Sequence, residues 1–228
     1  MLKLTFVGHA CFLLDDGKYR VVIDPFIANN PAAKIGVGDL KVDYILLTHG
    51  HGDHLGDAIE IARKNEATIV SNFELSLYCS SKGVKKTVGP HIGGVASLPF
   101  GSVKLTIAHH GSTLGNDPGY GGAPVGFVVR MGGKTVYHSG DTGLFMDMKL
   151  IGELDRLDAA MLPIGGFFTM DAKDAAKAVE FLQPKIAIPM HYGTFDLIKA
   201  DPAEFARMIK PFGSECVILK PGESHTLA

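Results

Sequence analysis

Residues 48–54, with the sequence THGHGDH, constrain this chain more than any other stretch, because they place three imidazoles and one carboxylate within six residues. The apolar run 44–47 before them predicts a buried strand. The apolar residues after them recur at helical spacing and predict a helix over 54–64. The donors therefore lie on a strand-to-helix loop, and such a concentration of nitrogen and oxygen donors predicts a metal site.

The spacing of these donors favours two metal ions over one. His49 and His51 are two residues apart, so their side chains project to the same side of an extended backbone and can hold one ion. Asp53 and His54 are adjacent at the expected helix start, where their side chains diverge and can serve a second ion. Because each divalent ion takes about four to six donors including water, more ligands are needed from elsewhere in the chain.

Further donors occur where other predicted strands end. His109 and His110 are rivals at the end of a strand that runs into a glycine loop. Asp141 and His191 close two later strands in the same way, and one carboxylate can bridge two cations. Strand ends that run into loops are common positions for functional side chains, so these residues are candidates to complete the site.

The pattern along the chain predicts a mixed α/β fold in one domain over residues 1–228. The first 40 residues read as strands joined by a hairpin at 15–17, and a second hairpin is expected over 126–138. Apolar stripes predict helices over 172–182 and 202–211. Residues 111–124 hold five glycines and two prolines and are expected to form a loop rather than a strand, either a lid or an ordered surface loop.

The composition of the chain argues against several classes of binding partner. A net charge of -2 with scattered Lys and Arg gives no basic patch for nucleic acid, and no run approaches the roughly 18 apolar residues of a membrane span. The amino terminus lacks the pattern of a signal peptide. The three cysteines are odd in number and far apart, which argues against a disulfide framework. We therefore expect a cytoplasmic protein without nucleic acid or membrane partners.

The donor segments together resemble a known family. Residues 48–54 are similar to the HxHxDH signature of the metallo-β-lactamase superfamily, and Asp24, His110, Asp141 and His191 match its other motif positions in order. Segments 8–9, 24–26, 137–142, 163–166 and 190–195 look like a largely uncharacterised bacterial and archaeal group of metal-dependent hydrolases, which is similar to the ascorbate-6-phosphate lactonase branch. The resemblance spans nearly the whole chain. It implies an αββα sandwich of two mixed β-sheets flanked by helices, with the metal site at one edge of the sheets.

The resemblance also implies a division of the ligands between two metals, with Asp141 bridging them. The first metal is assigned to His49, His51 and His110, and the second to Asp53, His54 and His191. His110 is favoured over His109 because the family segment usually has a nonpolar or aromatic residue directly before the ligand. His109 is then a residue that lines the pocket.

Other residues near the expected site have supporting roles. Asp24 closes a predicted strand, and both its position and the family suggest that it holds the ligand loops by hydrogen bonds. His9 and His138 lie in family-like segments but have no place in the usual ligand set, so a hydrogen-bonded interior position competes with a substrate role. Phe167, Phe168 and Met170, in the loop after 165–166, are expected in the core, in a pocket wall or in a homo-oligomer contact.

The expected activity is metal-dependent hydrolysis. Two divalent ions, zinc first with manganese, iron or nickel as alternatives, lower the pKa of a bridging water from about 15.7 towards 7. The resulting hydroxide would attack a small-molecule ester, lactone or phosphodiester, with Asp53 orienting it or shuttling its proton. The alternative is a non-hydrolytic metal-binding or redox module on the same fold. The redox version usually replaces ligand histidines with acidic residues, whereas this chain keeps its histidines.

Overall fold

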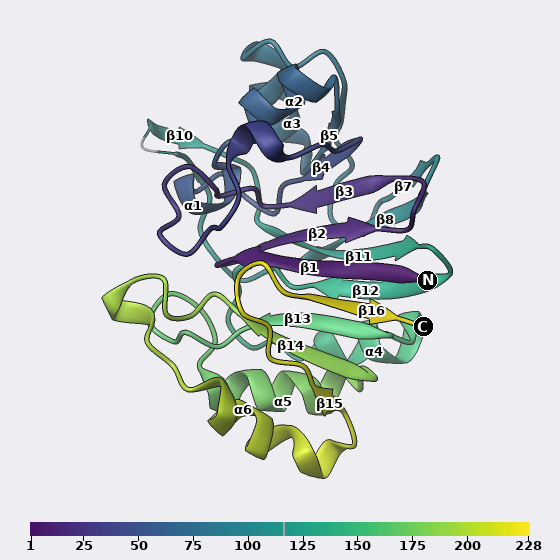
Figure 1. Cartoon of the computed structure of the whole chain (residues 1–228), viewed down its shortest axis with the longest axis vertical. Helices are drawn as coiled ribbons and strands as arrows, with labels where there is room; N and C mark the ends of the chain where they lie inside the picture. The colour runs from purple at the N-terminus through teal and green to yellow at the C-terminus, as the bar shows by residue number, and fades with distance from the viewer. Residues whose placement is uncertain (116) are drawn as a thin grey trace.

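Two seven-stranded β-sheets form the centre of the computed structural model, which describes residues 1–115 and 117–228 (Figure 1). The first sheet has the order β16 (Ser224–Leu227), β1 (Leu2–Gly8), β2 (Cys11–Asp15), β3 (Arg20–Ile23), β4 (Tyr44–Leu46), β5 (Thr68–Val70) and β6 (Thr87–Val88). The second has the order β15 (Glu215–Cys216), β14 (Ile186–Met190), β13 (Ala159–Pro163), β12 (Lys134–His138), β11 (Val125–Met131), β8 (Gly101–Ile107) and β7 (Val95–Leu98).

Both sheets are mixed in the same way. In the first sheet the pairs from β16 to β3 are antiparallel and those from β3 to β6 are parallel. In the second sheet the pairs from β7 to β12 are antiparallel and those from β12 to β15 are parallel. The carboxyl ends of neighbouring parallel strands meet at one edge of each sheet, which is where loops of α/β proteins gather functional side chains.

Helices cover the outer face of each sheet (Figure 1). The first sheet carries α1 (Gly52–Leu55), α2 (Ala58–Asn65) and α3 (Phe73–Ser81), and the second carries α4 (Met148–Asp155), α5 (Ala172–Leu182) and α6 (Pro202–Ile209). Three short 3-10 turns, η1 (Val37–Asp39), η2 (Asp196–Ile198) and η3 (Lys210–Phe212), lie in the connections. Within the described residues, no helix has both the length and the apolar character needed to cross a membrane.

Strand alternation builds three apolar clusters from these layers. Phe12 and Leu14 of β2 face the cluster between the two sheets, whereas Cys11 and Leu13 face the cluster under α2 and α3. A third cluster fills the space between the second sheet and α4 to α6. The predicted αββα sandwich of two mixed sheets is therefore confirmed.

The prediction of one continuous helix over 54–64 is wrong. It is divided into α1 and α2 at Gly56, whose φ is 42°. A Cβ at this position would lie 2.5 Å from the carbonyl oxygen of Pro25, so the close approach of that loop requires glycine and stops the helix. The break leaves α1 as a single turn that carries Asp53 and His54.

The prediction of a loop without strands over 111–124 is also wrong in part. Two short strands, β9 (Thr113–Leu114) and β10 (Asp117–Tyr120), pair there as an antiparallel ribbon. Residue 116 of this loop lies outside the described residues. The ribbon is anchored next to the metal-motif loop, because the N–H of Gly115 donates to the carbonyl of Gly50 at 2.7 Å.

Candidate metal centre

The predicted donors meet at the edge of the sheets that lies away from the two chain termini (Figure 1). They come from loops after separate strands: His9 after β1, Asp24 after β3, His49 and His51 between β4 and α1, and His110, Asp141 and His191 after β8, β12 and β14. Asp53 and His54 belong to α1. The αββα topology therefore joins both halves of the chain at one site.

His49, His51 and His110 form the first cluster. Their ligand atoms all lie within 4.8 Å of one another, and His49 Nε2 is 3.0 Å from His51 Nδ1. Burial lowers the pKa of all three imidazoles, that of His49 well below its usual value. Neutral imidazoles keep a free lone pair, which is the form that binds a metal ion.

A second cluster adjoins the first. The ligand atoms of His9, Asp53, His54 and His191 also lie within 4.8 Å of one another. Asp141 connects the two clusters, since its Oδ2 is 3.0 Å from His191 Nε2, 3.3 Å from His54 Nε2 and 3.6 Å from His110 Nε2. The carboxylate that the resemblance assigned to the bridge thus faces both clusters.

Several donor atoms in these clusters make no hydrogen bond. Nε2 of His54, Oδ1 of Asp141 and both ring nitrogens of His191 are buried without a hydrogen bond. Buried polar atoms without partners are costly and uncommon, and converging nitrogen and oxygen atoms of this kind suit a divalent cation. The residues present therefore fit a metal centre.

The charge of the site favours cations. Burial opposes the charged form of His54, but the carboxylates of Asp141, Asp24 and Asp53 outweigh it and raise the pKa of His54 well above its usual value. Burial also opposes ionisation of Asp141, but His191 and His54 hold the pKa of this carboxyl well below its usual range. The Asp141 carboxylate stays ionised and attracts positive charge to the point between the clusters.

Asp24 anchors the loop over 48–54, which carries the first donors. Its buried carboxylate accepts hydrogen bonds from the N–H of Thr48 at 2.8 Å and from the Thr48 hydroxyl at 2.6 Å. Its Oδ2 is also 2.8 Å from Nδ1 of His54. A bond from Nδ1–H to this carboxylate fixes the tautomer and leaves Nε2 of His54 facing Asp141, the arrangement common behind metal-bound histidines.

Backbone strain is concentrated at the site. His9, Asp24 and His191 have φ values of 60°, 47° and 53°, in the left-handed region. The other described non-glycine residues with positive φ, Glu66, Arg156 and Gln183, are helix C-caps, where this conformation is ordinary. An L-residue in this region costs about 1–2 kcal/mol, and strain collected away from helix ends indicates a functional constraint.

His9 lies inside the second cluster, although the family resemblance assigned it no ligand position. Its Nε2 is 3.1 Å from Oδ2 of Asp53, and its Nδ1 is 2.9 Å from the hydroxyl of Thr194. Burial lowers the pKa of His9 to about 4, so the ring is neutral at pH 7. Both ring nitrogens thus have protein partners, and the role of Thr194, 185 residues away in sequence, was missed.

Two predicted histidines lie outside the clusters. His109 is exposed, with its ring 5.1 Å from that of Phe145, and it does not belong to any of the converging groups found among the described residues. His138 is buried; its Nε2 bonds to the carbonyl of Ala10 at 2.9 Å and its Nδ1 accepts from the N–H of Gly140 at 3.1 Å. His138 therefore fixes the turn that leads into Asp141.

A cavity of about 430 Å³ opens over the clusters. His51, Asp53, His110, Asp141 and His191 line its floor, and Phe168, Phe195 and Leu197 line its wall. Phe168 was considered for a pocket wall on sequence alone. Phe195 and Leu197 were missed, because nothing in the local sequence shows that their loop folds over the metal motif.

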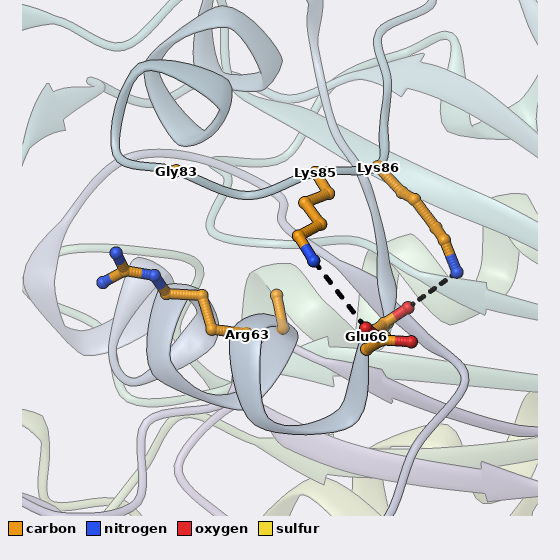
Figure 2. A pocket seen from close by; sticks show the side chains of 7 residues that line it. Arg63, Glu66, Gly83, Lys85 and Lys86 are labelled. Atoms are coloured by element: carbon orange, nitrogen blue, oxygen red, sulfur yellow. Dashed lines mark hydrogen bonds and ion pairs between the residues drawn. The ribbon is translucent and has the colours of Figure 1, made fainter.

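Another cavity, of about 300 Å³, lies at the end of α2 and does not resemble a binding site (Figure 2). Nζ of Lys85 is 3.8 Å from Oε1 of Glu66, and Lys86 donates to the Glu66 backbone carbonyl at 3.1 Å. These charges are exposed and already engaged with one another. The metal centre is therefore the stronger candidate for the functional site.

Comparison with known proteins shows the family of the chain. The family described as "Beta-lactamase superfamily domain" matches residues 3–191. A "UPF0173 metal-dependent hydrolase" of Heliobacterium modesticaldum is 52% identical over 234 residues, covering 100% of this chain and 98% of the relative. A protein of the same name from Archaeoglobus fulgidus is 49% identical over 229 residues, covering 98% of each chain.

A solved structure extends the agreement to the fold. Igni18, described as a metallo hydrolase from the archaeon Ignicoccus hospitalis, is 39% identical to this chain with a TM-score of 0.91. The match covers 100% of this chain and 98% of that structure.

Proposed function

The chain belongs to the β-lactamase superfamily, and from this premise we propose that it is a binuclear metal-dependent hydrolase of small molecules. In this proposal His49, His51 and His110 hold one divalent cation, and Asp53, His54 and His191 hold the other. Asp141 bridges the two. Zinc is the expected metal, with manganese, iron or nickel as alternatives, because histidine and aspartate suit all of them.

The observation that carries the proposal is the set of buried, converging donor atoms that make no hydrogen bond. Nε2 of His54, Nε2 of His191 and Oδ1 of Asp141 are buried without a hydrogen bond, and Oδ2 of Asp141 lies 3.3 Å and 3.0 Å from the two Nε2 atoms. A purely structural cluster would satisfy these atoms with hydrogen bonds. Relatives that share about half of the sequence carry the name of metal-dependent hydrolases, which supports the same activity here.

Cations bound at this site would lower the pKa of water towards neutrality and polarise the oxygen of an ester, lactone or phosphodiester bond. Asp53 is the residue suited to handle the proton of that water. Its side chain is 29% exposed, whereas that of Asp141 is 3% exposed. The imidazole of His9 holds Oδ2 of Asp53 in place, so the carboxylate can orient water and accept its proton from a fixed position.

Metal removal tests the proposed function. Protein purified from zinc- or manganese-supplemented cells should contain metal and hydrolyse part of a panel of chromogenic esters, lactones and phosphodiesters. Dialysis against a chelator should abolish turnover, and returning the metal should restore it. Full turnover in protein shown to be metal-free by elemental analysis would overturn the proposal.

The neighbours His109 and His110 provide a matched pair of variants. His110→Ala removes a member of the first cluster, so we expect metal content and turnover to fall sharply. His109→Ala removes an exposed ring packed on Phe145 and should leave the metal content unchanged. Elemental analysis and the same substrate panel measure both. Equal metal loss in the two variants, or loss only in His109→Ala, would show that the ligand at this strand end is misassigned.

A further inference from the structure

We infer that the substrate carries an uncharged, apolar group that packs against Phe168, Phe195 and Leu197 while its reactive bond lies over the metal centre. This inference rests on the proposed function and narrows it to uncharged esters or lactones with an alkyl or aryl portion. It is carried by the composition of the cavity wall.

The wall consists of apolar side chains that face water. Phe168, Phe195 and Leu197 are 48%, 40% and 60% exposed, and they come from the loops that follow β13 and β14. Phe195 is held in place, since its ring lies 5.4 Å from His9 and 6.4 Å from Phe26. A group that covers these side chains removes apolar surface from water, which favours binding.

The same cavity has no place for a charged tail. Among the described residues that line it, every polar side chain belongs to the proposed ligand set, and neither lysine nor arginine is present. Lys199, close by in sequence, does not line this cavity, and its Nζ is 2.7 Å from Asp196. A carboxylate or phosphate packed against these apolar side chains would lose hydration without gaining a partner, which is costly.

The volume of the cavity agrees with this substrate class. Pockets for small ligands span about 300–1,000 Å³, and this cavity, at about 430 Å³, lies toward the small end. A compact molecule with one apolar portion fits it.

Hydroxamates test the inference without turnover, because they chelate divalent cations and are not substrates. We would measure the Kd of acetohydroxamate, octanohydroxamate and suberic acid monohydroxamate on zinc-loaded protein by calorimetry. The last two have equal length and differ in a terminal methyl or carboxylate. Each buried methylene contributes about fourfold. Allowing for partial burial, we expect octanohydroxamate to bind at least about 10-fold more tightly than either of the others.

Variants test whether the apolar side chains of the cavity cause the preference for octanohydroxamate. Leu197→Ala and Phe168→Ala should reduce the preference for octanohydroxamate over acetohydroxamate at least threefold. Leu154→Ala, which removes a leucine that is 70% exposed on α4, should leave this preference unchanged. If acetohydroxamate binds but the three ligands have equal Kd values, or the carboxylate-ended ligand binds best, the inference is overturned while the metal centre stands. If no hydroxamate binds the zinc-loaded protein, the proposed function fails and the inference fails with it.

Discussion

Replacing Asp141 by asparagine is expected to reduce kcat/KM by at least about 10³-fold, which corresponds to about 4 kcal/mol of lost transition-state stabilisation. Asp141 faces both clusters, with Oδ2 3.0 Å from His191 Nε2 and 3.6 Å from His110 Nε2. Asparagine has nearly the same shape but lacks the negative charge, and its amide cannot bridge two cations. Both metal retention and turnover should therefore fall, as measured by elemental analysis and by kinetics on the best panel substrate.

Asp155→Asn is the matched control for this prediction. Asp155 is also a buried aspartate, but its partners are Lys104 and Arg130 instead of histidines. Its replacement should lower the free energy of unfolding while leaving the metal content and kcat/KM of the folded protein close to those of the unmodified chain. An Asp141→Asn protein that kept both metals and full turnover would contradict the bridging role.

Asp24→Ala is expected to have the largest effect on stability, about 3 kcal/mol or more in the free energy of unfolding. The substitution removes the acceptor for two groups of Thr48 and for the Nδ1–H of His54. All are buried, and each unsatisfied donor costs about 1–3 kcal/mol. Urea unfolding in the presence of chelator measures this effect, because bound metal then makes no contribution to either protein.

The same variant should bind zinc about 10–100-fold more weakly, since the partner that orients His54 is gone. Asp43→Ala is the control. Asp43 is exposed and its carboxylate accepts a hydrogen bond from the N–H of Arg20 at 2.9 Å, so we expect a loss of less than about 1 kcal/mol and no change in zinc affinity. Equal stability losses in the two variants would show that Asp24 does not hold the ligand loop as described.

The fold class was predicted correctly, and several of the donors singled out in the sequence lie close together in the structure, because strands and the residues at their ends follow local patterns. Apolar alternation marked the strands, and histidines or aspartates at strand ends marked the loops. The resemblance to the metallo-β-lactamase superfamily, which the family match confirms, supplied the αββα order. The likeness to the lactonase branch and the cytoplasmic location remain predictions.

The errors arose where distant segments decide the local conformation. The apolar stripe over 54–64 fits one continuous helix, and only the carbonyl of Pro25 in three dimensions explains the break at Gly56. The bond between His9 and Thr194, and the placement of Phe195 over the cavity, join segments separated by most of the chain. Such contacts leave no periodic signal in the sequence, so they could not be predicted from it.

Anomalous X-ray diffraction at the zinc edge, on crystals of protein purified with zinc, tests the central claim most directly. We expect two peaks per chain, one ligated by His49, His51 and His110 and one by Asp53, His54 and His191. Asp141 should contact both, and His9 should bond to Asp53 without ligating a metal. Diffraction from zinc-saturated crystals that showed no peak at this edge of the sheets, or a peak held by other side chains, would contradict the account.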